Sequence, residues 1–139
     1  MENEQWLYQV RIRVNQEISE KLRKKEKKGT SKEIFNIAKE FSTTPVCTFD
    51  AFYEYCKEAE ELGIEKYPLY HWTKKTIEDP KKKIKHSKSF AFYTSNDQVY
   101  EKSLAQALYN KLKPLLDQGF IEELRLIDSN PKNNPQPPT

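Results

Sequence analysis

Apolar and polar residues alternate along residues 6–14, and this is the clearest pattern in the chain. Every even position from Trp6 to Val14 is apolar or aromatic, whereas positions 9, 11 and 13 carry glutamine and arginine. A period of two with β-branched and aromatic residues predicts a strand with one buried and one polar face. Similar patterns predict strands over 89–94 and 120–127, and a short extended piece over 46–48.

Between these strands, apolar residues recur every three or four positions, which predicts amphipathic helices. Thr30 and Ser95 each precede a glutamate or glutamine by three residues, a capping-box pattern that marks a helix start. Pro80 is expected to stop the helix before it, and Pro114 to kink or break the last helix. The expected helices cover 15–28, 30–42, 49–62, 68–79 and 96–118.

Glycine is scarce, and each glycine follows a segment predicted to be helical. We therefore expect all three glycines to close the last turn of a helix. No glycine is then left for a phosphate-binding loop, and neither common nucleotide-binding glycine motif occurs. The glycines are Gly29, Gly63 and Gly119.

The order of these elements predicts an α+β fold. A small mixed sheet of three to four strands is expected to carry helices on one face. A helical insertion lies between the first two strong strands, as a variant of the ferredoxin-like fold would allow. A right-handed crossover would make the last two strands parallel. Residues 1–128 are expected to form a single domain, and 129–139, rich in proline and asparagine, a disordered tail.

Composition narrows the class of protein further. The 139 residues fit one domain, and no apolar run is long enough to span a membrane. The N-terminus lacks the features of a secretory signal, and two cysteines are too few for a structural zinc site. We expect a cytoplasmic protein with reduced thiols, no metal and no cofactor.

The net charge of +3 conceals strongly segregated charge. Residues 21–32 carry seven basic residues and one acid, and residues 74–88 carry seven lysines and two acids. These two lysine-rich segments together carry a net charge of +11, so the rest of the chain carries a net charge of −8. Such segments can attract a polyanion or an acidic protein, although solvated surfaces are the more common outcome. Lysine outnumbers arginine 20 to 4, which weakens the case for specific phosphate recognition.

Residues 88–95, with the sequence KSFAFYTS, resemble the octamer motif of the RNA-recognition-motif family. Lys88, Phe90, Ala91 and Phe92 match the motif, whereas positions 89, 93 and 95 depart from it. The resemblance implies that Phe90 and Phe92 stack on bases from an open sheet face, with Tyr8 on the companion strand. The separation of the two strands, by residues 15–88, exceeds what that compact family allows. The candidate nucleic-acid-binding residues are Tyr8, Arg11, Arg13, Phe90, Phe92, Lys81, Lys82, Lys83, Lys85 and Lys88.

Candidates for other chemistry are few. His71 is the one histidine that we would test as an acid or base, and Cys47 precedes a helix whose N-terminus can lower a thiol pKa. Nothing in the sequence brings these two residues together. Tyr67, Tyr70 and Trp72 form an aromatic segment that is a candidate protein interface, with burial in the core as the alternative.

Three functions stay open at this point. The first is a non-catalytic interaction or regulatory domain that binds a protein or self-associates. The second is an RNA or single-stranded nucleic-acid binder that uses sheet aromatics and lysines. The third is a small enzyme with a site centred on His71. The absence of a catalytic motif favours the first.

Overall fold

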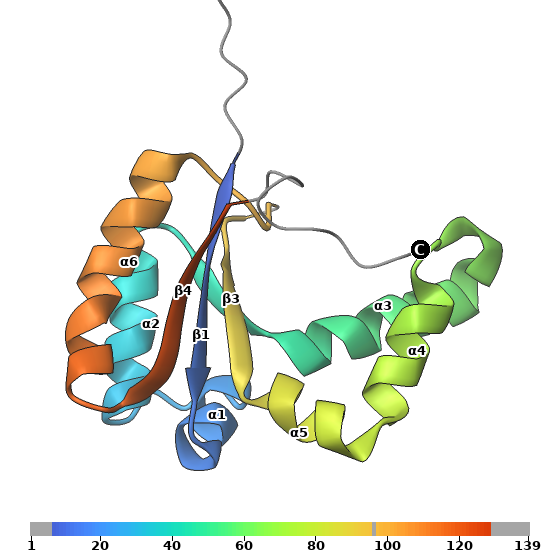
Figure 1. Ribbon diagram of the computed structural model, residues 1–139, viewed down its shortest axis with the longest axis horizontal. Helices are drawn as coiled ribbons and strands as arrows, with labels where there is room; N and C mark the ends of the chain where they lie inside the picture. The colour runs from blue at the N-terminus through green and yellow to red at the C-terminus, as the bar shows by residue number, and fades with distance from the viewer. Residues whose placement is uncertain (1–6, 96, 129–139) are drawn as a thin grey trace, which may run out of the picture.

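The structure, a computed structural model, describes residues 7–95 and 97–128. The tail expected over 129–139 lies outside these residues. In chain order the elements are β1 (Tyr8–Val14), α1 (Gln16–Arg23), α2 (Thr30–Glu40), β2 (Thr44–Cys47), α3 (Thr48–Leu62), the 3₁₀ turn η1 (Ile64–Lys66), α4 (Tyr70–Glu78), α5 (Pro80–Ser87), β3 (Ser89–Tyr93), α6 (Lys102–Asp117) and β4 (Ile121–Asp128) (Figure 1).

The expected α+β fold with a small sheet is confirmed. The strands form one four-stranded sheet in the order β2-β3-β1-β4, and each neighbouring pair is antiparallel. Strands β3 and β4 are both antiparallel to β1 and therefore run parallel to each other, as the crossover through α6 predicts. Strand β1 lies between them, and β3 and β1 are the two inner strands of the sheet.

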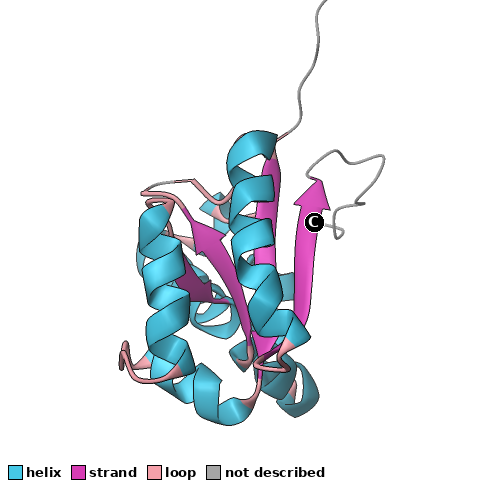
Figure 2. Ribbon diagram, turned by 90° about the vertical axis from the view of Figure 1, so that its left-hand side faces the viewer, coloured by secondary structure: helices cyan, strands magenta, loops and turns pink. Residues whose placement is uncertain are grey.

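Helices α1, α2 and α6 cover one face of this sheet. Figure 2, viewed from that side, shows helices in front of the strands. The even-numbered residues of β1 point into this layer, and they pack against the leucines of α6 and the aromatic residues of β3. The largest fully buried side chains include Phe90, Phe92, Ile34, Leu108, Leu112, Ile121, Val10 and Val14.

The helical insertion continues as a helical arm, residues 48–87, which extends from the other side of the sheet (Figure 1). Ring contacts hold its helices together: Phe52 packs edge-on against Trp72 at 5.9 Å, and Tyr55 against Tyr67 at 5.4 Å. The hydroxyl of Tyr70 donates to Glu60 at 2.7 Å. The aromatic segment that the sequence offers as a protein interface thus ties α4 to α3.

Two helix starts differ from the sequence prediction. Gly29, at φ +58°, is the N-cap of α2, so Thr30 lies inside the helix and Gly29 does not close α1. Helix α1 ends earlier than expected, at Arg23. Helix α6 begins after Glu101, so Ser95 does not cap it. Short polar residues favour both caps and turns, and local sequence does not separate the two roles.

The two prolines that were expected to disrupt helices agree with the prediction only in part: α4 ends at Glu78, just before Pro80, as expected. Pro80 is the first residue of α5, and the Asp79 carboxylate accepts hydrogen bonds from the next two backbone N–H groups. Proline is well tolerated there, because its missing N–H has no partner in the first turn. Helix α6 continues through Pro114 to Asp117 without a break, since the buried Leu112 and Leu115 hold it against the core on both sides of the proline.

Lys25 and Ser42, each the residue after a helix C-cap, adopt left-handed backbone conformations at φ +60° and +56°. A residue with a Cβ pays roughly 1–2 kcal/mol for this conformation, and glycine does not. Substitution by glycine therefore relieves this strain, but glycine also gives the unfolded chain more conformational entropy, which offsets roughly 0.4–1 kcal/mol of the stabilisation. We therefore expect Lys25→Gly and Ser42→Gly each to raise the free energy of unfolding by about 0.5 kcal/mol in urea denaturation.

Lys24→Gly provides the matched control for this substitution. Lys24 caps α1 at φ −85°, where a side chain is unstrained, so glycine there brings only the entropic cost. Destabilisation by all three substitutions would contradict the prediction.

Candidate anion-binding groove

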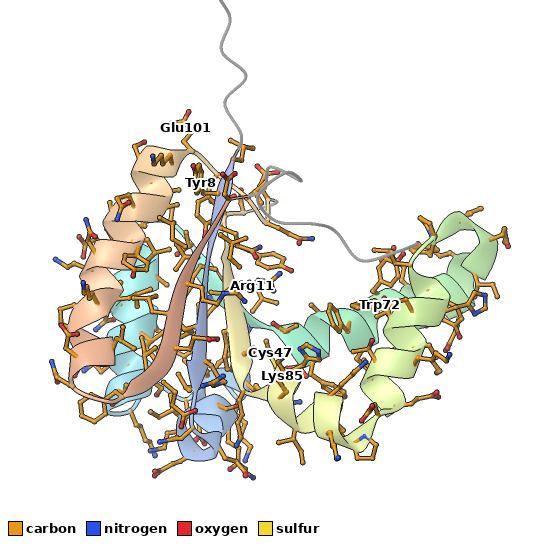
Figure 3. All side chains as sticks on the ribbon, viewed as in Figure 1. Tyr8, Arg11, Cys47, Trp72, Lys85 and Glu101 are labelled. Atoms are coloured by element: carbon orange, nitrogen blue, oxygen red, sulfur yellow. The ribbon has the colours of Figure 1, made fainter. Side chains whose placement is uncertain are left out.

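The sheet face that does not contact α1, α2 and α6 carries the polar residues of β1 and β4. Together with the start of the arm and the end of α5, it encloses a cavity of about 120 Å³. We call this cavity the arginine groove. Its lining residues are Arg11, Ile12, Arg13, Thr48, Lys85, His86, Ser89, Glu123 and Arg125. Figure 3 shows Arg11 on the sheet and Lys85 on the α5 side.

Three of the four arginines of the chain meet in the arginine groove, and the strand register decides how they are paired. Arg13 lies opposite Glu123, and its guanidinium is 3.8 Å from that carboxylate and 3.4 Å from Glu122. Arg11 lies directly opposite Arg125. In the part of the chain that the structure describes, neither of these two guanidiniums forms an ion pair with a carboxylate.

A buried side chain orients Arg11. Gln9, which is 5 % exposed, accepts a hydrogen bond from Arg11 Nε at 2.6 Å and donates one to the carbonyl of Gln98 at 2.8 Å. The terminal N–H groups of Arg11 are left for other partners. Burial lowers the pKa of Arg11 from its ordinary value, Tyr93 opposes this, and the charge of Arg125 lowers the pKa further.

Helix α5 supplies the other wall of the arginine groove through Lys85 and His86. The imidazole of His86 packs edge-on against Phe52 at 5.3 Å, which fixes its place at the base of the arm. Burial lowers the pKa of His86 below its ordinary value, and the neighbouring cations Lys85 and Arg11 lower it further. The neutral form of the ring is therefore favoured, and Lys85 supplies the positive charge of this wall.

The two lysine-rich segments meet beside this wall. The ring of Phe49 has the guanidinium of Arg23, from the first segment, at 5.7 Å, and the ammonium of Lys83, from the second, at 5.6 Å. The Ser19 hydroxyl also joins α1 to the carbonyl of Ser87 at the end of α5. The basic surface beside the arginine groove therefore consists of α5 lysines such as Lys83 and Lys85, because the Arg23 guanidinium is paired with the Asp50 carboxylate at 2.7 Å.

The predicted aromatic stacking platform is wrong. Phe90 and Phe92 are 1 % and 0 % exposed and point into the core. Tyr8 lies on the same core-side face of β1, half-buried against the core cluster. Strand β3 alternates, so Ser89, Ala91 and Tyr93 are the side chains that it turns toward the other face. No base can stack on either phenylalanine unless the core opens.

The candidate cations divide into two groups. Arg11, Arg13 and Lys85 line the arginine groove, as a phosphate-binding role requires. The other lysines do not: Lys81 and Lys82 are exposed in the first turn of α5, Lys83 lies over Phe49, and Lys88 is the half-buried C-cap of α5.

The structure does not pair Cys47 with His71. Cys47 is 4 % exposed at the start of α3, and its thiol contacts the carbonyl oxygens of His86 and Ser87 at 3.7 and 3.6 Å. Burial raises the pKa of this thiol and outweighs the opposing hydrogen bonds from the α3 backbone, so the expected lowering is wrong. His71 is exposed on α4, with its ring 5.2 Å from that of Tyr70.

Sequence reasoning missed Arg125 and Gln9 as site residues. The alternation in β4 already places Arg125 on the polar face, and the same alternation in β1 places Gln9 beside Arg11. The alternation within each strand does not predict that β1 pairs with β4, and this pairing brings together strands from opposite ends of the chain.

Comparison with protein-family models, with the curated proteins and with the solved structures finds no match. Among the described residues, no group of three or more potential metal ligands is close enough to hold an ion. None of the helices in that part of the chain has the length and apolar character needed to cross a membrane.

Proposed function

We propose that this protein is a non-catalytic binding domain whose arginine groove and adjoining basic surface bind the phosphates of single-stranded nucleic acid. The observation that carries the proposal is the pairing of Arg11 with Arg125 directly across β1 and β4, where neither guanidinium forms an ion pair with a carboxylate of the described residues. Like charges directly opposite each other destabilise a sheet. A local cost of this kind is typical of a binding site, where a ligand compensates for it.

The residue types favour phosphate as the group that is bound. Arginine presents its N–H donors in a planar fork that matches phosphate oxygens, and it is weakly hydrated for a cation. The few arginines of the chain are concentrated here, whereas its many lysines are spread over the surface. The scarcity of arginine thus no longer counts against phosphate recognition.

The basic surface favours a polymer over a small anion. It extends from Arg11 and Arg125 past Lys85 to Lys83, so successive phosphates of one strand have successive cations to contact. The small cavity between the sheet and α5 favours a single strand over a duplex. Because the sheet phenylalanines are buried, phosphate contacts rather than base stacking supply the affinity.

Fluorescence anisotropy with labelled single-stranded oligonucleotides of about ten nucleotides tests this proposal. Binding is expected at low salt, and the affinity is expected to fall with rising salt because each phosphate contact releases counterions. Contacts with the four cations Arg11, Arg125, Lys85 and Lys83 give a slope of about −3 in a plot of log affinity against log salt concentration.

The double variant Lys25→Ala/Lys39→Ala is the matched control, because it removes two cations beside α2 that do not line the arginine groove. Its salt slope is expected to equal that of the unchanged protein. No binding at low salt, or an affinity that salt does not change, would overturn the proposal.

A further inference from the structure

We propose that the arginine groove holds the terminal phosphate of the bound strand, rather than a phosphodiester from its interior. This inference rests on the proposed function and specifies how the strand is placed. Its first support is size. The cavity of about 120 Å³ fits a group of a few heavy atoms, far below the roughly 300–1,000 Å³ of pockets that enclose whole small molecules.

The charge and donors of the arginine groove form the second support. A terminal phosphomonoester carries close to two negative charges at neutral pH and presents three strong acceptor oxygens, as a phosphorylated side chain does. A phosphodiester carries one charge and has two free oxygens. Arg11 and Arg125 offer two uncompensated guanidiniums, and Lys85 adds an ammonium to the opposite wall. Thr48 and Ser89 also line this cavity, and the Ser89 hydroxyl donates to the Lys85 carbonyl at 3.1 Å.

The direction in which positive charge continues is the third support. On the α5 side, the basic surface leads away from the arginine groove through Lys85 to Lys83. On the β4 side, Glu122 and Glu123 accompany Arg13 and repel a phosphate chain. A strand therefore has one favourable way out of the cavity. This suits an end of a chain, because an internal phosphate needs a favourable path in both directions.

Three oligonucleotides of one sequence test the inference: one with a 5′-phosphate, one with a 3′-phosphate and one with hydroxyls at both ends. We expect one of the two phosphorylated forms to bind roughly tenfold more tightly than the hydroxyl form, since charged hydrogen bonds to the phosphate are gained. The form that gains affinity identifies the end that enters the cavity.

Two variants locate the effect. Arg125→Ala is expected to remove the preference, so that phosphorylated and hydroxyl strands bind equally weakly. Lys81→Ala, on the exposed side of α5, is expected to lower the affinity of all three strands by the same factor and to keep the preference. The circular dichroism spectrum of each variant establishes that it is folded.

The outcomes separate this inference from the proposed function. Equal and salt-dependent binding of all three strands to the unchanged protein would overturn terminal recognition and leave the proposed function intact. Loss of binding for all three would overturn both. A preference that persists in Arg125→Ala would place the terminal phosphate elsewhere and overturn this inference alone.

Discussion

Replacing Phe92 by alanine is expected to lower the free energy of unfolding by about 3–5 kcal/mol, the range for removing a fully buried phenylalanine. Phe92 is 0 % exposed, in the layer between the sheet and the helices α1, α2 and α6. Urea denaturation measures the loss. Because small domains have about 5–15 kcal/mol in total, Phe92→Leu is the companion variant that stays folded, with an expected cost below about 1.5 kcal/mol.

Tyr93→Ala is the matched control on the next residue of β3. Tyr93 is half-buried on the opposite sheet face, outside the core cluster, so its truncation is expected to cost clearly less than that of Phe92. If Phe92→Leu instead left stability unchanged and abolished nucleic-acid binding, Phe92 would be a stacking residue. The resemblance of residues 88–95 to the RNA-recognition motif would then describe a function.

The strands were predictable because their periodicity is local. Residues 8–14 alternate without exception in the sequence, and the structure places β1 there with Val10, Ile12 and Val14 buried. The same reasoning could not decide whether the phenylalanines of β3 point into the core or toward solvent. Alternation places Phe90 and Phe92 together on one face, but the positions of α1, α2 and α6 decide which face is the core. That information lies in tertiary packing.

The helix boundaries show where local signals compete. Asp79-Pro80 ends one helix and begins another, because a residue that cannot continue a helix is favourable in its first turn. The sequence prediction used only the first property and missed α5, which contributes Lys85 and His86 to the arginine groove. The site was incomplete without that helix.

The arginine groove itself depends on a register that no local pattern contains. The polar faces of both strands were predicted, yet the opposition of Arg11 and Arg125 follows only from the pairing of β1 with β4. A one-residue change of register would move one of them to the core face. The continuity of the two lysine-rich segments likewise depends on the packing of α1 and α5 around Phe49.

The substitution Arg125→Glu is expected to change stability and binding in opposite directions. A glutamate opposite Arg11 replaces a repulsive cross-strand pair by an attractive one, which is worth roughly 0.2–1 kcal/mol in the free energy of unfolding. The same change puts a negative charge where a phosphate is expected. We expect the affinity for a single-stranded oligonucleotide to fall by about 100-fold, or roughly 2.8 kcal/mol.

Glu123→Arg provides the mirror-image control on the same two strands. It replaces the attractive Arg13–Glu123 pair by a repulsive one, so stability is expected to fall while the affinity for the oligonucleotide is kept or rises. Denaturation and anisotropy measurements give the change in stability and the change in affinity for each variant. Within each variant the two changes are expected to have opposite signs only if phosphate binds here. If Arg125→Glu lost stability and kept its affinity, the Arg11–Arg125 pair would be a structural feature of the sheet and the case for this binding site would fail.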